Sequence, residues 1–187
     1  MTGTRIALLQ MTSGIDPAEN AAAIVSAAAQ ARQGGAAMLF TPEMCGLLDR
    51  NRERAAARIV AEADDPVLAA VQAAAADNGI AIALGSLAVR RDDGRLANRS
   101  FMIDASGAIT ARYDKIHMFD VALASGESWR ESAAYEPGDQ VVAAGSALGK
   151  LGLAICYDMR FPALFEALGR LHCDAIAIPA AFTVPTG

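Results

Sequence analysis

Two segments of this sequence carry the same helix signature, and an apolar run follows each of them directly. Residues 16–35 (DPAENAAAIVSAAAQARQGG) start with Asp16 as an N-cap and Pro17 at the first helical position, and they end in glycines. Residues 64–79 repeat this order of acid, proline, alanine-rich run and glycine. Short apolar runs, which predict buried strands, follow at residues 36–40 and 80–86. Two helices that each lead into a strand predict an α/β fold.

The rest of the sequence adds hairpins to this alternation. Residues 87–104, which turn at Asp93-Gly94, and residues 140–156 both predict antiparallel strand pairs. Further strands are expected at residues 5–10, 106–115 and 173–182, and a further helix at 161–172. Hairpins among helix–strand units predict a layered α/β (α+β) architecture, with a mixed sheet or two stacked sheets. Residues 113–138 form a long irregular stretch, and loops of that length are usually functional.

Length and composition limit the class of protein. A chain of 187 residues with 53% hydrophobic residues and a mean hydropathy of +0.27 predicts one folded domain, and disorder is excluded. No uncharged apolar stretch approaches the ~20 residues that a membrane-spanning helix needs. The N-terminal residues lack the pattern of a secretory signal, and three cysteines without CxxC spacing fit a reducing compartment. We therefore expect a cytoplasmic protein, in which the sequon NRS at residues 98–100 is accidental.

Charge and missing motifs narrow the chemistry further. The net charge is −5, and the arginines are scattered except at residues 50–54, so nucleic-acid binding is not expected. The sequence contains no GxSxG, GxGxxG or GxxxxGK[ST] motif, and its two histidines cannot supply a His-rich metal site. We predict no cofactor and no metal. Any catalysis must then depend on cysteine, carboxylates and lysine.

The strongest nucleophile candidate is Cys156, within the segment GLAICYDMRFP (residues 152–162). An apolar strand-like run ends at this cysteine, and charge and a proline follow within a few residues. A thiol at a strand-to-helix turn can lie near backbone N–H groups, which lower its pKa and can bind an oxyanion. Spacing alone leaves a structural cysteine equally possible. Cys45 and Cys173 are interpreted as packing residues.

Three further charged residues are candidates for a functional role. Glu43 follows a predicted buried strand directly, where it is either a turn carboxylate or a functional acid. Lys115 follows another strand end; it is one of only two lysines, with Lys150, among 16 basic residues. It is either solvated or retained for its ammonium group. Glu131 lies in the long loop and, taken alone, reads as a surface acid.

Taken in order, Glu43, Lys115, Glu131 and Cys156 resemble the catalytic set of the carbon–nitrogen hydrolase (nitrilase) superfamily, which uses a Glu-Lys-Cys triad. The resemblance covers essentially the whole chain, from IALLQM to IPAAF. It is closest to the Nit-type amidase branch, which includes omega-amidases and deaminated-glutathione amidases. In that branch Tyr-Asp and then Arg-Phe-Pro follow the cysteine, as they do here. True nitrilases typically have Trp-Glu after the cysteine, so nitrile hydrolysis is disfavoured.

The resemblance implies a role for each residue. Glu43 would be the general base, Cys156 the nucleophile, and Glu131 the acid that orients Lys115. The Lys115 ammonium and the backbone N–H of Tyr157 would stabilise the oxyanion. Asp158 and Arg160 would brace the turn after the cysteine, and Arg160 has a second possible role as a ligand for a substrate carboxylate.

The resemblance also implies a fold, an assembly and a reaction. The fold would be an αββα sandwich, which in the family usually forms homodimers or larger homo-oligomers. Residues 1–187 would be a single domain that lacks its C-terminal part, because family members continue past this point. The expected function is a thiol amidohydrolase that acts on a small linear amide and releases ammonia. An N-carbamoyl amidase of the same superfamily and a non-catalytic binding or assembly paralogue are the alternatives.

Overall fold

The computed structural model describes residues 3–122 and 128–182. Its α-helices are α1 (Pro17–Gln33), α2 (Arg52–Ala56), α3 (Pro66–Asn78) and α4 (Pro162–Arg170), with 3₁₀ turns η1 (Glu62–Asp64), η2 (Glu131–Ala133) and η3 (Cys156–Arg160). Its strands are β1 (Ile6–Leu8), β2 (Met38–Phe40), β3 (Ala81–Arg90), β4 (Leu96–Ile103), β5 (Ile109–Asp114), β6 (Asp120–Ala122), β7 (Ser128–Arg130), β8 (Ala143–Ser146), β9 (Gly149–Leu153) and β10 (Ala175–Ala177). Within the described ranges, no helix combines the length and apolarity needed to cross a membrane.

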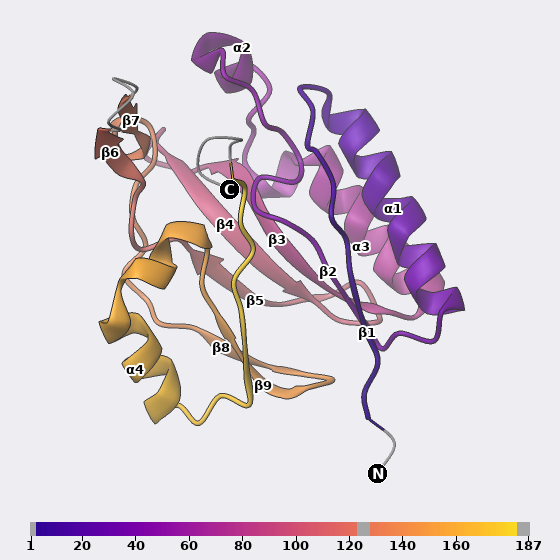
Figure 1. The fold of residues 1–187 in the computed structure, drawn as a ribbon. Coiled ribbons are helices and arrows are strands. Elements are labelled where there is room, and N and C mark those ends of the chain that lie inside the picture. The colour runs from indigo at the N-terminus through magenta and orange to yellow at the C-terminus, as the bar shows by residue number, and fades with distance from the viewer. Residues whose placement is uncertain (1–2, 123–127, 183–187) are drawn as a thin grey trace.

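Two sheets form the centre of the molecule (Figure 1). The larger has the order β1-β2-β3-β4-β5; β1, β2 and β3 are parallel, and β4 and β5 continue antiparallel. The smaller has the order β10-β9-β8, in which β9 pairs parallel with β10 and antiparallel with β8. Strands β6 and β7 form a separate antiparallel pair.

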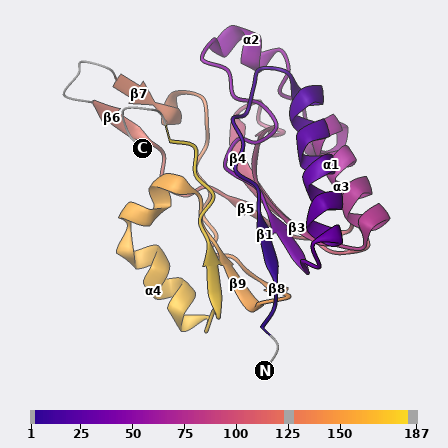
Figure 2. The ribbon, with the colours of Figure 1, turned by 45° about the vertical axis from the view of Figure 1, so that its right-hand side comes forward.

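The molecule is layered as helix, sheet, sheet, helix (Figure 2). Helices α1 and α3 pack on one face of the larger sheet in a core that includes Ile24, Val71 and Phe101. The other face of that sheet packs against the smaller sheet, where Tyr113 and Leu153 belong to one buried cluster. Helix α4 covers the outer side of the smaller sheet. The layered α/β architecture predicted from the sequence is confirmed.

The helix starts follow the predicted cap chemistry. Asp16 and Asp65 are the N-caps of α1 and α3, and each accepts a hydrogen bond from a backbone N–H of the first turn. In each helix proline occupies the first position, where its missing N–H has no intrahelical partner to lose. Gly79 ends α3 in the left-handed conformation, at φ +59°.

Two sequence predictions need correction. The expected strand 80–86 and the first arm of the expected hairpin 87–104 are one continuous strand, β3, with a register shift between Leu84 and Leu87. A bulge lets a strand continue past an irregular segment, so a change of pattern there does not end the strand. The stretch 113–138 is not irregular throughout, because it contains β6, β7 and η2. Residues 123–127 of that stretch lie outside the described residues.

Candidate active site

Glu43 stands on a loop that the bulge of β3 holds in place. The loop follows β2, and hydrogen bonds connect it to β3. The Gly85 N–H donates to Thr41 Oγ1 at 2.8 Å, and the Met44 N–H donates to Ser86 Oγ at 2.9 Å. Met44 adopts a left-handed backbone, at φ +53°, which turns the chain back after the acid. The Glu43 side chain is 7% exposed. A carboxylate is therefore fixed at the end of a buried strand.

Gly85 is required for this loop to approach β3. A Cβ added at residue 85 would overlap the carbonyl oxygens of Thr41 and Pro42, which are backbone atoms that cannot rotate away. We therefore expect Gly85→Ala to lower the free energy of unfolding by about 2 kcal/mol and to reduce activity by displacing Glu43. Thermal melts and initial rates measure both effects. Gly169→Ala is the matched control, because its Cβ would meet nothing within 4 Å in helix α4. Equal melting temperatures for the two variants would contradict the role given to Gly85.

Lys115 follows the last residue of β5 and lies between the two sheets. Its backbone N–H donates to the Asn98 carbonyl at 2.9 Å, so the pairing of β5 with β4 extends by one residue. On its other side the Gly138 N–H donates to the Lys115 carbonyl at 2.9 Å. Tyr113, two residues earlier, faces the inter-sheet core, and Lys115 shares that face because strand side chains alternate. The lysine side chain is 2% exposed.

Glu131 opens the 3₁₀ turn that follows β7. The backbone N–H of Phe119 donates to its Oε2 at 2.7 Å. Its side chain is 15% exposed, so the structure does not support the reading of Glu131 as an ordinary surface acid.

One ammonium joins the two carboxylates. Lys115 Nζ donates to Glu43 Oε1 at 2.9 Å and to Glu131 Oε2 at 2.9 Å, with a longer contact of 3.2 Å to Glu131 Oε1. Burial disfavours the charged lysine, but the two carboxylates outweigh burial and raise the pKa of Lys115 above its ordinary value. The two carboxylates therefore favour the charged form of a lysine that is buried away from solvent.

Cys156 lies beside this cluster, at the start of turn η3. Its backbone has φ +45°, an uncommon conformation for a non-glycine residue, and its N–H donates to the Pro179 carbonyl at 2.8 Å. The Ala181 N–H donates to Glu43 Oε2 at 3.0 Å and also interacts with the Cys156 sulfur. The nucleophile candidate and the acid therefore share a backbone donor.

The expected lowering of the Cys156 pKa is wrong. Burial, the negative charge of Glu43 and a hydrogen bond to that carboxylate raise the pKa of Cys156 to about 12, and the Ala181 N–H and Lys115 offset this only in part. The physical reason is that burial and the neighbouring Glu43 carboxylate both disfavour a thiolate, and together they outweigh the Ala181 N–H and the Lys115 charge. At neutral pH the residue is a thiol that donates to Glu43.

The turn after the cysteine is braced by Asp158, which is fully buried. Its carboxylate accepts hydrogen bonds from the Tyr113 hydroxyl at 2.7 Å, the Ile155 N–H at 2.8 Å and the His117 N–H at 3.0 Å. His117 Nδ1 lies 2.7 Å from the same carboxylate. The Arg160 side chain is exposed and makes no hydrogen bond or ion pair within the described ranges, so its expected bracing role is not seen there.

Tyr157, whose backbone N–H is the expected oxyanion donor, follows Cys156 directly in turn η3. No oxygen of the described residues accepts a hydrogen bond from its N–H. Its ring packs edge-on against Phe119 and Phe161, with centroid distances of 5.1 and 5.4 Å. Phe161 in turn stacks on the imidazole of His117 at 3.7 Å. The 156–162 segment is thus held by aromatic packing as well as by Asp158.

The other cysteines have packing environments. Cys45 is fully buried, and its sulfur lies 3.3 Å from Thr41 Oγ1 and 3.4 Å from the Ser86 carbonyl. Burial raises the pKa of Cys45 to about 11. Cys173 is half-buried and packs on the cluster formed with α4.

The free energy of unfolding should fall as the pH rises above about 9. Unfolded thiols titrate at about 8.5, whereas the folded protein raises the pKa of Cys45 to about 11 and that of Cys156 to about 12. The unfolded state therefore loses these protons first, which costs about 1.4 kcal/mol per pH unit for the buried Cys45. The raised pKa of Lys115 acts in the same direction, because its stabilisation is present below the unfolded pKa and is lost as pH rises through the folded one. Urea unfolding between pH 8 and pH 11 measures the slope, and Cys45→Ala should make it shallower; a flat profile would contradict these shifts.

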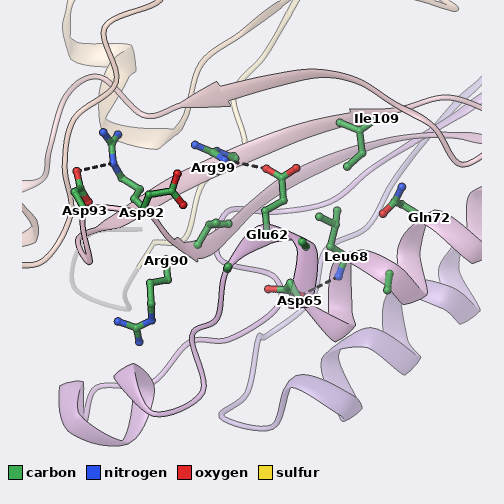
Figure 3. A pocket seen from close by; sticks show the side chains of 14 residues that line it. Glu62, Asp65, Leu68, Gln72, Arg90, Asp92, Asp93, Arg99 and Ile109 are labelled. Atoms are coloured by element: carbon green, nitrogen blue, oxygen red, sulfur yellow. Dashed lines mark hydrogen bonds and ion pairs between the residues drawn. The ribbon is translucent and has the colours of Figure 1, made fainter.

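A separate cleft lies on the face of the main sheet opposite to the cysteine site. It measures about 750 Å³, and its lining includes Glu62, Asp65, Arg90 and Arg99 (Figure 3). Arg99 donates to Glu62 Oε2 at 2.9 Å and to Asp114 Oδ2 at 2.9 Å. Its neighbour on the strand, Asn98, points to the other face. The cleft is therefore separate from the cysteine site, and its arginines are occupied by acids and carbonyls.

Sequence reasoning missed Asn98, whose side-chain nitrogen donates to Glu43 Oε1 at 3.0 Å and to Glu131 Oε1 at 3.1 Å. The only signal at this residue was a glycosylation sequon, which is irrelevant inside a sheet. Pairing the predicted strand 106–115 with the hairpin before it could have placed Asn98 opposite Lys115. The partners of Asp158 were also missed, because Tyr113 and His117 are distant in sequence.

Comparison with known proteins agrees with this geometry. The carbon–nitrogen hydrolase family matches residues 5–186. A deaminated glutathione amidase from Yersinia enterocolitica is 36% identical over 190 residues, which cover 100% of this chain and 66% of that protein. A hydrolase from Schizosaccharomyces pombe is 32% identical and covers 98% of this chain and 56% of its own length. The chain thus spans less than two thirds of the length of these relatives.

Solved structures give the same result. An amidase from Nesterenkonia sp. AN1, in a mutant form with acrylamide added at its active site cysteine, superposes with a TM-score of 0.83 at 28% identity, covering 96% of this chain and 68% of its own. The same amidase in complex with butyramide has a TM-score of 0.82 at 29% identity, with 96% and 66% of the chains covered. The layered fold is therefore of the nitrilase type. The chain belongs to the carbon–nitrogen hydrolase family.

Proposed function

We propose that this chain is a thiol amidohydrolase, which cleaves the C–N bond of a small linear amide through a cysteine acyl-enzyme and releases ammonia. The observation that carries the proposal is the buried Lys115 ammonium, hydrogen-bonded to both Glu43 and Glu131, with Glu43 beside the Cys156 thiol. A carboxylate, a thiol and a buried ammonium that lie together support roles as base, nucleophile and stabilising charge. Acyl transfer from an amide needs those three functions.

In the acylation step Glu43 takes the thiol proton as Cys156 Sγ bonds to the amide carbon. The carbonyl π electrons move to the oxygen, and the resulting oxyanion is stabilised by Lys115 and by the Tyr157 N–H. The C–N bond then breaks, and the leaving nitrogen takes the proton from Glu43 and departs as ammonia. A thiol with a pKa of about 12 supports this order, because the proton must leave as the sulfur attacks.

In the deacylation step Glu43 acts as base again. It takes a proton from water while the water oxygen bonds to the thioester carbon. The C–S bond breaks, the sulfur regains a proton from Glu43, and the carboxylic acid leaves. Because Lys115 ties up only Oε1 of Glu43, the second oxygen of that carboxylate can face the reacting atoms.

The proposed substrates are ω-monoamides of dicarboxylates or a compound like deaminated glutathione. The name of the Yersinia relative and the butyramide complex of the Nesterenkonia amidase support a small linear amide. Arg160 is the candidate ligand for a substrate carboxylate, since its side chain is exposed next to the nucleophile turn. A homo-oligomeric state and a cytoplasmic location stay predictions, which light scattering and cell fractionation would test.

A panel assay of ammonia release tests the proposal. The purified protein is offered butyramide, an ω-monoamide of a dicarboxylate, deaminated glutathione, an N-carbamoyl amine and a nitrile. We expect turnover of the amides and none of the nitrile. Preference for the N-carbamoyl amine would replace the amidase assignment by that of a carbamoylase. A folded protein that turns over none of these compounds would contradict the proposal and favour a binding paralogue.

A further inference from the structure

Asn98 occupies the centre of the charged cluster, although it carries no charge. It lies on β4 directly across from Lys115 and is 1% exposed. Its side chain points between the sheets, on the face opposite to the Arg99 cleft. No other element of the described structure brings a neutral donor into contact with both acids.

Asn98 and Lys115 donate hydrogen bonds to the same oxygen atom, Oε1, of each carboxylate. Oε1 of Glu43 and Oε1 of Glu131 each accept from Asn98 Nδ2, at 3.0 and 3.1 Å. The same two oxygens accept from Lys115 Nζ, at 2.9 and 3.2 Å. Oε2 of Glu43 accepts from the Ala181 N–H, whereas Oε2 of Glu131 accepts from the Phe119 N–H and also from Lys115 Nζ at 2.9 Å. Asn98 and Lys115 therefore hold Glu43 and Glu131 together, although these two acids lie 88 residues apart in sequence. We call this arrangement the clamp.

Charge explains why an amide suits this position. Two buried anions face one cation, so Lys115 neutralises only one of them. A second cation would hold Glu43 too tightly for it to accept a proton, whereas an apolar side chain would leave the acids repelling each other. An amide NH₂ offers two N–H donors without a charge.

In this position the oxygen of the Asn98 side chain is left without a hydrogen-bond partner. Asn98 Oδ1 is buried, and within the described ranges it is the one buried side-chain nitrogen or oxygen that has no hydrogen-bond partner. Turning the amide over would satisfy nothing, because Oδ1 would then face two carboxylates. An unsatisfied buried acceptor destabilises the fold. Such a feature persists where another function depends on it.

We propose that Asn98 is a positioning residue, which clamps Glu43 and Glu131 against Lys115 and stabilises the ionised form of Glu43. The inference rests on the proposed function for its effect on catalysis. Its effect on the two acids does not depend on any substrate. Other titratable groups around the clamp are Cys156 and Tyr135. Burial, and then the charges of Glu131 and Glu43, raise the pKa of Tyr135.

The first test is the pH profile of Asn98→Leu, which keeps the approximate volume and removes both donors. We expect kcat to fall roughly tenfold to a hundredfold with little change in KM, because hydrogen bonds to charged groups have effects of that size and both Asn98 donors are directed at the two acids. The acidic limb of the profile should move to higher pH, since Glu43 must be ionised to take the thiol proton. An unshifted profile with a loss that matches the loss of folded protein would overturn the proposal.

The second test needs no turnover. The difference in melting temperature between wild type and Asn98→Leu should be larger at neutral pH than at the acidic end of the folded range, because the lost donors serve ionised carboxylates. Asn20→Leu is the matched control: Asn20 is also buried, but it bonds only the backbone of Gly14 and Gly46, so its difference should stay constant with pH.

The two tests separate the two failures. If the wild type turned over no amide but the stability difference still depended on pH, the proposed function would be contradicted and the clamp would be supported. A stability difference that is the same at both pH values for both variants would overturn the clamp, whatever the activity.

Discussion

Cys156→Ala should abolish ammonia release and leave the fold in place. The sulfur is the proposed carrier of the acyl group, so we expect kcat to fall by a factor of about 10⁴ or more. The residue is half-buried, and alanine fits its backbone conformation as well as cysteine does. The melting temperature should therefore change by no more than about 4 °C, which corresponds to about 1 kcal/mol for a chain of this size.

Cys173→Ala is the matched control for this variant. Cys173 is half-buried too, but it packs beside α4, away from Glu43. We expect it to keep wild-type kcat and KM per folded molecule. Substantial ammonia release by Cys156→Ala, measured on protein free of wild-type contamination, would show that another nucleophile or direct water attack performs the reaction.

Lys115→Met should damage both activity and stability. Methionine is similar in length but leaves two buried carboxylates without their cation, and removing one partner of a buried ion pair costs about 3–5 kcal/mol. Because the Lys115 ammonium is proposed to stabilise the oxyanion, its loss should lower kcat by about 10²–10³. Because the destabilisation comes from ionised acids, it should shrink as the pH falls.

The only other lysine provides a control. Lys150 is exposed, and its Nζ donates to the Leu171 carbonyl at 2.8 Å on the surface. Lys150→Met should change the free energy of unfolding by less than about 0.5 kcal/mol and leave kcat unchanged. Similar effects of the two substitutions, in urea unfolding and initial rates, would mean that Lys115 has no special electrostatic role.

The elements that were predictable from the sequence are those specified by local chemistry. The caps Asp16 and Asp65, each followed by proline, place the starts of α1 and α3 to within a residue. The turn at Asp93-Gly94 places the hairpin of β3 and β4. Each of these signals acts over a few residues. Local signals could not show that β3 continues through its bulge at 84–87, because the bulge contacts the Glu43 loop, which is distant in sequence.

The features of the site also divide into those that the local sequence indicates and those that only the assembled fold determines. A thiol at the end of an apolar run and a rare lysine after a strand mark candidates, and resemblance to a family groups them. The raised pKa of Cys156 could not be predicted, because it depends on the burial of the sulfur and on the Glu43 carboxylate beside it, which the folded chain determines. Asn98 was missed for a related reason: its importance comes from the register of β4 with β5, and register is a property of the assembled sheet.

Acyl transfer to hydroxylamine tests the central claim, a thioester on Cys156, most directly. The protein is incubated with butyramide and increasing hydroxylamine, and butyric acid, butyrohydroxamic acid and ammonia are quantified together. A thioester intermediate predicts that hydroxamate forms at the expense of the acid, and that Cys156→Ala forms neither product. Ammonia release with butyric acid as the sole acyl product at every hydroxylamine concentration would contradict the account.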